Sequence, residues 1–568
     1  MHMKKPWWKD KIVYQIYPKS FADSNGDGIG DLRGIIEKLP YLQALGVDIL
    51  WLCPVFCSPM ADNGYDISDY EHIDPMFGTD EDMTELIAEA KRHGIRILLD
   101  LVINHTSDRH AWFQAALKDP ESPEGSFYIL KKGVNGGPPN NWRAIFGGSV
   151  WEKVGDTDLY YYHTFAREQP DLNWENPALR EKLYAMIRAW LEKGIAGFRI
   201  DAIAFIKKDP EYASYPPDDA DGLVAVQRGG ENQPGIDVFL KELKEQTFSR
   251  YDCLTVAEAT GISLDEVAAF AGPDGYFSMT FNFLLCDIDL TEDYRWYEPR
   301  KWDAKDFRKC FFDVMEATSS VGYSPNFLEN HDLPRSLNHY IPEEDIGFMS
   351  ASMLATLLLT AHGVPFIYQG EELGMTNARR SSIDEFEDLS TRDQHERALA
   401  AGVPPEQALM YMNRRSRDHS RTPFQWNAGQ GAGFTAGEPW LKLNPNYVSV
   451  NAEVQERDPD SILSYYRNLI RLRKGLLYNV LCDGDLREYR AGDSDIIAYT
   501  RTIGSESVLI AHNFSSYDAI LPLGGAYEVL LTNGPAPDFA AGGAVLKPYQ
   551  SVILRPENGL IAEGGARN

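Results

Sequence analysis

The feature that most constrains this 568-residue chain is a repeated alternation of short apolar segments with helix-period segments. The expected strands are residues 11–18, 47–55, 94–104, 195–203, 253–259, 276–283, 323–332 and 363–371. The expected helices between them are residues 35–45, 82–93, 177–193, 236–251, 304–318 and 347–362. Eight parallel strands with helical crossovers close most economically into a (β/α)₈ barrel, an α/β fold of the TIM-barrel type.

Three stretches fall outside this alternation. Residues 105–173 are rich in Gly, Pro, Trp and Tyr and lack a helical period, which predicts a small inserted domain over the barrel mouth. Residues 375–458 are polar with charged helical patterns, and we expect a post-barrel subdomain that closes one wall of the site. Residues 481–568 alternate like antiparallel strands separated by turns, which predicts a C-terminal β-sandwich. The barrel is expected over residues 1–104 and 174–480.

The composition limits the classes of partner. The net charge of −29, from 55 Lys and Arg against 84 Asp and Glu, repels phosphate backbones and anionic membranes. We therefore expect no nucleic-acid partner, no membrane partner and a neutral ligand. The 6 cysteines are scattered, which suits free thiols in a reducing compartment, and residues 1–10 lack the apolar core of a secretion signal. These features predict a cytoplasmic protein, and we expect a monomer or a weak homo-oligomer.

Charged and polar residues interrupt the apolar strands near their C-terminal ends. Arg199 and Asp201 lie two apart in one strand, so they point the same way, and bidentate hydrogen bonds from Arg199 are expected to keep Asp201 ionised. Alone, this pair fits a structural ion pair as well as a catalytic one. Because the C-terminal ends of barrel strands meet at one mouth, polar residues at three further ends favour catalysis. They are Asp100, Asn104 and His105 in and after the third strand, Glu258 in the fifth, and Asn330, His331 and Asp332 in the seventh.

Three carboxylates at one mouth suit the hydrolysis of an acetal. In the retaining reaction one carboxylate attacks the anomeric carbon while another, about 5–5.5 Å away, protonates the leaving oxygen. Asp201, held ionised by Arg199, is the expected nucleophile. Glu258 has no cation beside it in the sequence and lies in an apolar strand, so its pKa is expected to be raised, as a general acid requires. Asp332 is then left to bind ring hydroxyls.

These four strand-end segments resemble the four signature regions of the α-amylase family, glycoside hydrolase family 13. Residues 169–173, Gln-Pro-Asp-Leu-Asn, resemble the further signature of its oligo-1,6-glucosidase and α-glucosidase branch, and the resemblance covers nearly the whole chain. It implies that Asp201 is the nucleophile, Glu258 the acid/base and Asp332 the carboxylate that stabilises the transition state. The same subsite would be lined by Arg199, His105 and His331.

A second part of the resemblance concerns the end of the pocket. Residues 62–65, Asp-Asn-Gly-Tyr, resemble the family's pocket floor. This implies that Tyr65 stacks under the sugar and that Asp62 pairs with Arg417. Such a pair closes the pocket beyond the terminal glucose, which implies exo action. Phe165 resembles an aromatic that flanks the sugar, although an ordinary core Phe of the inserted domain explains it nearly as well.

A Gly-rich loop near the N-terminus places oxygen-bearing residues at alternate positions. Asp23, Asn25, Asp27 and Asp31 supply side-chain oxygens, whereas Ile29 offers only its backbone carbonyl. This spacing fits a turn around Ca²⁺, like the first half of an EF-hand loop. It also fits an Asx-rich turn without a metal. The family resemblance implies a calcium site here, with a structural role.

The preferred glycosidic linkage depends on residues beside the expected nucleophile. Ala202 stands where relatives that prefer α-1,6 bonds typically carry Val, and Thr260 where some of them carry Trp. We therefore favour α-1,4 or mixed linkage, with maltose and malto-oligosaccharides as substrates and sucrose as a further candidate. Because such differences shift preference only about 10–200-fold, an oligo-1,6-glucosidase remains open.

Three further alternatives concern the reaction or its loss. A sucrose isomerase or transglucosidase shares this architecture, but residues 333–340 lack the arginine-rich loop of many isomerases. A sugar-phosphate hydrolase would need a cationic subsite, which Arg300, Lys301, Arg414 and Arg415 would have to form. A non-catalytic sugar-binding relative would typically lack one of the three carboxylates, all of which are present here.

Overall fold

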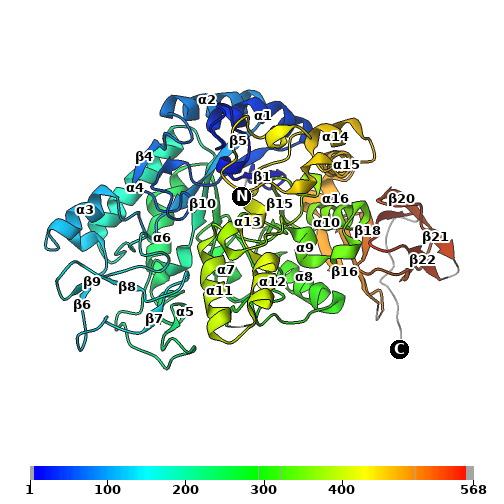
Figure 1. Ribbon diagram of the computed structural model, residues 1–568. Helices are drawn as coiled ribbons and strands as arrows, with labels where there is room; N and C mark the ends of the chain where they lie inside the picture. The colour runs from blue at the N-terminus through cyan, green and yellow to red at the C-terminus, as the bar shows by residue number, and fades with distance from the viewer. Residues whose placement is uncertain (1–4, 292, 320, 493, 541, 558–568) are drawn as a thin grey trace.

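The computed structural model describes residues 5–557 apart from residues 292, 320, 493 and 541. At its centre is one eight-stranded sheet in which every paired neighbour is parallel (Figure 1). The strands follow the order β13-β12-β10-β5-β2-β1-β15-β14. Their bounds are β1 (Val13–Ile16), β2 (Ile49–Leu52), β5 (Arg96–Val102), β10 (Gly197–Asp201), β12 (Leu254–Ala257), β13 (Met279–Thr280), β14 (Pro325–Asn326) and β15 (Val364–Tyr368).

Each of these strands lies within one of the eight predicted segments, so the predicted barrel is confirmed. The two strands at the ends of the sheet, β13 and β14, have only two residues each. No ladder between them is formed in the described part of the chain, so the barrel is nearly but not fully closed.

Helices between the strands cover the outside of the barrel (Figure 1). The helix α15 packs against both α1 and α10, so it fills the eighth position and completes the ring. The helices are α1 (Leu32–Leu45), α2 (Asp80–Arg92), α4 (Pro177–Glu192), α6 (Ile236–Gln246), the short α7 (Val267–Phe270), α8 (Ala304–Ser319), α10 (Phe348–Thr360) and α15 (Ile462–Lys474).

Local sequence explains where these helices begin. Before α2, the Thr79 hydroxyl accepts from the Asp82 N–H at 3.1 Å, and the Asp82 carboxylate accepts from the Thr79 N–H at 2.8 Å. This capping box satisfies donors that the first turn would otherwise leave unpaired. The Asn176 side chain caps α4 by accepting from the Ala178 N–H, and Pro177 occupies the first helical position, where no backbone donor is needed.

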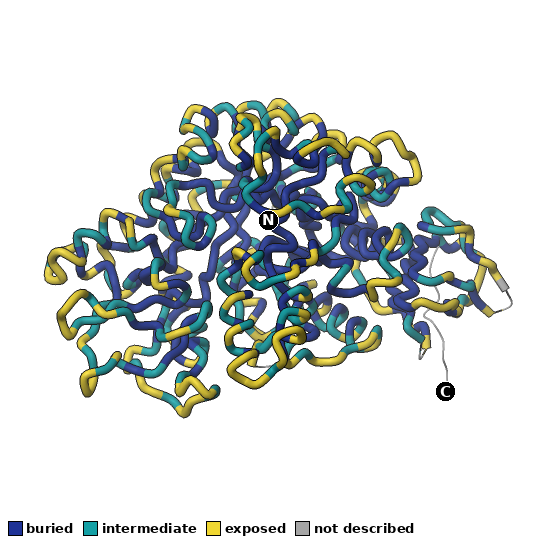
Figure 2. The backbone as a smooth tube through the Cα atoms, in the orientation of Figure 1, coloured by how far each residue is buried: buried dark blue, intermediate teal, exposed yellow. Residues whose placement is uncertain are grey.

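The barrel strands are almost wholly buried, as the dark blue centre of Figure 2 shows. Side chains that alternate along them form two separate cores. One core, inside the barrel, includes Ile49, Leu98, Val256 and Phe366. The other lies between the strands and the helices. Parallel strands buried on both faces require near-continuous apolar runs, which is why these segments could be recognised in the sequence.

The segment after β5 forms small sheets beside the barrel (Figure 1). Strands β6 (Leu130–Lys132), β9 (Leu159–Tyr162) and β8 (Trp151–Lys153) make an antiparallel sheet. Strand β7 (Trp142–Arg143) pairs instead with β11 (Val224–Ala225), which belongs to the loop after β10. This pairing ties the inserted segment to the loop that follows the strand carrying Asp201.

Four helices follow β15 before the ring closes: α11 (Leu389–Ala400), α12 (Pro405–Arg415), α13 (Asp418–Arg421) and α14 (Ala452–Arg457). After α15 and α16 (Tyr478–Asp483), the C-terminal part forms a five-stranded and a three-stranded antiparallel sheet. The strands are β16 (Asp485–Glu488), β17 (Ile496–Ile503), β18 (Glu506–Asn513), β23 (Ser551–Pro556) and β20 (Tyr527–Thr532), then β19 (Ala519–Pro522), β22 (Gly543–Leu546) and β21 (Asp538–Ala540).

Apolar side chains from these two sheets, among them Leu509, Leu521, Leu546 and Leu554, form one shared core, as a β-sandwich requires. All six cysteines are free. Within the described residues, no helix combines the length and the apolar character needed to cross a membrane.

Candidate active site

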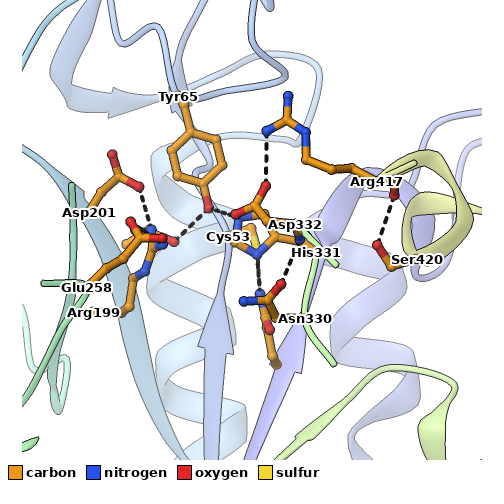
Figure 3. Close-up of polar contacts among 12 residues, drawn as sticks. Cys53, Tyr65, Arg199, Asp201, Glu258, Asn330, His331, Asp332, Arg417 and Ser420 are labelled. Carbon is orange, nitrogen blue, oxygen red and sulfur yellow. Dashed lines mark hydrogen bonds and ion pairs between the residues drawn. The ribbon is translucent and has the colours of Figure 1, made fainter. Parts of the chain in front are cut away.

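The C-terminal strand ends bring the three predicted carboxylates to one place. Asp201 is the last residue of β10, Glu258 follows β12 directly, and Asp332 lies six residues beyond the end of β14. Asp201, Glu258 and Arg199 lie on one side of Tyr65, and Asp332 and Arg417 lie on the other (Figure 3).

Arg199 is the centre of the first group. Its Nη1 donates to Asp201 Oδ1 at 2.7 Å and to Asp100 Oδ1 at 2.8 Å, and its Nη2 lies 2.8 Å from Glu258 Oε2. The side chain of Arg199 is only 1% exposed. The predicted pair of Arg199 and Asp201 is therefore present, but one buried guanidinium serves three carboxylates.

The charge balance of this group corrects the expectation for Asp201. Burial raises the pKa of Asp201 well above its ordinary value, and Glu258, Asp100 and Asp332 raise it further, whereas Arg199 acts in the opposite direction. A cation shared by three carboxylates cannot offset both the loss of hydration and the repulsion among them. Arg199 thus acts on the pKa of Asp201 in the predicted direction, but burial and the neighbouring carboxylates outweigh it.

Glu258 also has surroundings that differ from the prediction. The sequence places no cation beside it, but barrel pairing of β10 with β12 brings Arg199 to it. Its Oε2 also accepts a hydrogen bond from the Ala202 N–H at 3.0 Å. Glu258 therefore lacks a cation beside it in the sequence, as stated, but has one in the folded protein. The Glu258 side chain is 16% exposed, whereas that of Arg199 is 1% exposed, so Glu258 is the more accessible of the two.

Ala202 has an unusual backbone conformation. With φ 44° and ψ 33° it lies in the left-handed region, which costs a non-glycine residue on the order of 1–3 kcal/mol. In this conformation the N–H of Ala202, the residue after Asp201, points at Glu258. Its methyl side chain is 5% exposed.

Asp332 belongs to a second group, in which one carboxylate has several cations. Its Oδ1 accepts from Arg417 Nη1 at 3.0 Å and from Arg421 Nη2 at 2.9 Å, and its Oδ2 lies 2.8 Å from His331 Nε2. Burial acts to raise the pKa of Asp332, but His331, Arg417 and Arg421 hold it well below its ordinary value. Conversely, burial opposes protonation of His331, yet Asp332 raises the pKa of this imidazole to about 10.

Tyr65 connects the two groups. Its hydroxyl donates to Asp100 Oδ2 at 3.0 Å and contacts His331 Nε2 at 2.5 Å. Its ring stacks on His331 with 5.3 Å between the ring centroids and 10° between the planes. His331 therefore lies at the hydroxyl end of Tyr65, and this contact joins the two groups.

The predicted pair of Asp62 and Arg417 is present. Arg417 Nη2 lies 3.6 Å from Asp62 Oδ1, while its Nε donates to Asp388 Oδ1 at 2.7 Å. Gln169 Nε2 donates to Asp62 Oδ2 at 3.1 Å and lies 3.1 Å from His105 Nε2. Through Gln169, the Gln-Pro-Asp-Leu-Asn segment thus connects Asp62 with His105, two residues of the predicted subsite.

His105 and Phe165 form a further wall. Burial lowers the pKa of His105 to about 4, so the imidazole is neutral near pH 7. The half-buried Phe165 ring lies 5.2 Å from the His105 ring and 5.8 Å from the Phe205 ring, measured between centroids. Phe165 therefore belongs both to the wall around His105 and to the apolar cluster of the inserted segment.

The side chains of the N-terminal loop bond mainly to the loop itself, and Asp23 also accepts from the Thr435 hydroxyl. Asp23 accepts from three backbone N–H groups at 2.7–2.9 Å, and Asn25 and Asp27 each accept the N–H two residues on at 2.9 Å. Asp31 caps α1. The donor set, with the Ile29 carbonyl, consists only of hard oxygens, as Ca²⁺ prefers. Within the described residues no three or more His, Cys, Asp or Glu side chains are placed to hold a metal ion, and in this loop Asn25 and the Ile29 carbonyl would have to complete the set. Calcium therefore stays a prediction.

Three contributors to the cluster were not among the predicted site residues. Asp100 completes the Arg199 group, and Arg421 and Asp388 complete the surroundings of Asp332 and Arg417. Arg421 follows Arg417 by four residues, a spacing that places both on one face of a helix turn. That spacing was the available signal for Arg421, whereas no local pattern marked Asp388.

Comparison with known proteins agrees with this geometry. A model described as the catalytic domain of α-amylase matches residues 15–483, and one described as the C-terminal domain of the α-amylase SusG matches residues 496–553. An oligo-1,6-glucosidase of Parageobacillus thermoglucosidasius is 42% identical over 92% of this chain and 92% of its own length.

Two further relatives carry other activities in their names. A trehalose-6-phosphate hydrolase of Bacillus subtilis (strain 168) is 39% identical over 97% of this chain and 98% of its own length. The crystal structure of an isomaltulose synthase from Klebsiella sp. LX3 is 39% identical, covers 97% of this chain and 99% of that one, and superposes with a TM-score of 0.90.

Proposed function

The chain belongs to the α-amylase family, glycoside hydrolase family 13, and we propose that it is a retaining, exo-acting α-glucosidase of short α-glucosides. The observation that carries the proposal is the shared position of Asp201 and Glu258 on Arg199, with Asp332 across Tyr65 (Figure 3). Two carboxylates held at one site are the elements that double-displacement hydrolysis requires.

In the proposed first step, a carboxylate oxygen of Asp201 attacks the anomeric carbon. The glycosidic bond breaks, and Glu258 gives its proton to the leaving oxygen. In the second step, Glu258 takes a proton from water while the water oxygen attacks the anomeric carbon. The ester to Asp201 breaks and glucose leaves with its original configuration. Asp332 binds ring hydroxyls throughout, as an anion held by three cationic neighbours.

In this proposal, exo action results from the residues that close the end of the pocket. Arg417 reaches from Asp332 towards Asp62, and Gln169 continues the line to His105. A chain that extended beyond the terminal glucose would have to displace these buried, hydrogen-bonded groups. The cost of leaving their partners unsatisfied disfavours internal cleavage.

Two observations favour different glycosidic linkages. Ala202, small and buried beside the expected nucleophile, favours α-1,4 or mixed linkage, with maltose, malto-oligosaccharides and sucrose as candidate substrates. A relative that shares 42% identity is named an oligo-1,6-glucosidase, which supports α-1,6 linkage as the alternative. Sucrose isomerisation is a second alternative, because a structure of similar fold is an isomaltulose synthase.

A phosphorylated sugar is supported less well. Three of the four cations considered for a phosphate subsite already have carboxylate partners: Arg414 lies 3.1 Å from Asp289, Arg415 also contacts Asp289, and Arg300 lies 3.4 Å from Asp306. Such neutralised cations are poor phosphate ligands unless these pairs rearrange.

The deciding experiment compares glucose release from maltose, isomaltose, sucrose and trehalose 6-phosphate as kcat/KM, with Asp201→Asn as the blank. A preference for maltose supports α-1,4 hydrolysis, and a preference for isomaltose keeps the mechanism but reverses the linkage. If the variant released glucose at the wild-type rate from any of them, the assignment of Asp201 would be overturned.

A structural Ca²⁺ ion at the N-terminal loop is a separate part of the proposal. It is supported by the all-oxygen donor set of Asp23, Asn25, Asp27, Ile29 and Asp31 and by the family resemblance. Removal of calcium by a chelator should lower Tm more than it lowers activity, because none of these groups touches the carboxylate cluster. Loss of activity at unchanged Tm would argue against it.

The remaining expectations are a cytoplasmic location, a monomer or weak homo-oligomer, and domain boundaries near residues 104, 174 and 481. Cell fractionation, sedimentation velocity and limited proteolysis test them in turn. Cleavage within the barrel rather than between the expected domains would contradict the boundaries.

A further inference from the structure

Asp388 touches neither Asp201 nor Glu258, yet it is the main anchor of Arg417. It is the residue before α11 and is 1% exposed. Its Oδ1 accepts from Arg417 Nε at 2.7 Å, and its Oδ2 accepts from the Arg417 backbone N–H at 3.3 Å. One carboxylate therefore holds both the backbone and the side chain of Arg417.

This anchoring decides where the rest of the guanidinium points. With Nε bound to Asp388, Nη1 reaches Asp332 at 3.0 Å and Nη2 faces Asp62 at 3.6 Å. Nη2 is buried, and within the described residues it has no hydrogen-bond partner. An unsatisfied buried donor is costly, so its position requires strong restraint of the planar group by the other nitrogens.

Asp388 is itself fixed by contacts that do not involve Arg417. It accepts from the Ser390 N–H at 3.1 Å, as the N-cap of α11, and from the Thr391 hydroxyl at 2.6 Å. Behind it, the Asp418 carboxylate accepts from the Glu387 N–H at 2.7 Å. The helix α11 and its preceding loop thus hold the carboxylate in place.

We propose that Asp388 is a positioning residue that sets Arg417 so that one guanidinium serves Asp332 and the pocket end together. The inference rests on the proposed glucosidase function. The charge of Asp388 restrains Arg417 through a charge-assisted hydrogen bond, and a neutral side chain would let the guanidinium turn away from Asp332.

The variant Asp388→Asn separates this role from helix capping, because Asn caps a helix about as well as Asp. We expect kcat/KM to fall by about 10–100-fold, the usual worth of a hydrogen bond between charged groups. Thr391→Ala is the matched control. Thr391 does not touch Arg417, and its hydroxyl bonds the same carboxylate and Ser416 Oγ, so the variant removes neighbouring hydrogen bonds and activity should stay within about threefold of wild type.

A double-mutant cycle with Arg417→Lys distinguishes positioning from a merely structural effect. Lys lacks the Nε that Asp388 holds, so adding Asp388→Asn to Arg417→Lys should cost at most about threefold. If Asp388→Asn lowered kcat/KM by the same factor in both backgrounds, or left wild-type activity unchanged, the proposal would be overturned.

A crystal structure of Asp388→Asn gives a readout that does not depend on which substrate is cleaved. We expect Arg417 Nη1 to have left Asp332, with α11 in place. Retention of the wild-type Arg417 position would contradict the inference, whereas a wild-type protein inactive on every α-glucoside would contradict the proposed function alone.

Discussion

The Arg199 group and the Asp332 group face each other across Tyr65 and have opposite charge balances (Figure 3). In the first, three carboxylates share one guanidinium, and the pKa of Asp201 is raised because burial and the neighbouring carboxylates outweigh Arg199. In the second, one carboxylate has two arginines and a histidine, which overcome burial and lower the pKa of Asp332. Two aspartates at one mouth are thus given different protonation behaviour by the ratio of cations to carboxylates around them.

The largest effect should come from removing the single cation of the Arg199 group. Arg199→Met leaves three carboxylates without the cation they share, which should lower the free energy of unfolding by about 3–5 kcal/mol and abolish turnover. Urea unfolding and glucose release measure the two effects. Arg199→Lys, which keeps the charge, is the control and should unfold at a higher urea concentration than Arg199→Met. Equal stability of wild type and Arg199→Met would show that the three carboxylates do not depend on this cation.

The next effect should come from neutralising the second group. Asp332→Asn should lower kcat/KM by about 10²–10⁴-fold if Asp332 binds the transition state. Because the Asp332 charge raises the pKa of Asp201, the variant should also move the acid limb of its pH–rate profile to lower pH.

The pH–rate profile of the variant is the measurement that checks this shift. A limb that stayed in place would mean that the two groups are not electrostatically coupled, or that another residue controls the limb. Asp332→Glu keeps the charge and serves as the control.

A smaller effect is expected from Arg421→Lys. Lys keeps the positive charge near Asp332 but has a single donor nitrogen, whereas Arg421 reaches Asp332 Oδ1 with Nη2 and the His331 carbonyl with Nε, at 2.9 Å each. We expect kcat/KM to fall by about tenfold, the worth of one charge-assisted hydrogen bond, without a shift of the acid limb. A shift as large as that of Asp332→Asn would mean that Lys does not replace the charge.

The smallest effect concerns stability. In an unfolded chain the pKa of Asp is about 3.9, and in the folded protein the pKa of Asp201 is higher. At any pH between the unfolded-state pKa and the folded-state pKa, Asp201 therefore takes up a proton when the chain folds. The stability that protonated Asp201 contributes is therefore lost as pH rises. Asp201→Asn should raise Tm by a few degrees at pH 7 and by less at pH 4. Identical Tm differences at the two pH values would contradict the raised pKa.

The predicted parts of the site are those that follow from strand order. Asp201, Glu258 and Asp332 were identified because each follows an apolar run that reads as a buried strand, and parallel strands end at the same mouth. The branch-specific segment with Gln169 and the pair of Asp62 and Arg417 were placed through resemblance, and their contacts are present.

The parts that were wrong or missed depend on neighbours distant in sequence. Arg199 meets Asp100 across 99 positions, and it meets Glu258 only because β10 pairs with β12. Arg417 meets Asp388 through a helix that begins after a loop of irregular structure. No local periodicity records such meetings, so the expected protonation of Asp201 and the surroundings of Glu258 were misjudged.

The sequence by itself determined the barrel, the C-terminal sheets and the residues at the strand ends, because apolar periodicity and turn residues act over a few neighbouring positions. The tertiary structure alone decided which carboxylates share a cation and which has several. That outcome depends on distances between charges in a buried site, where each contact is strengthened by the exclusion of water.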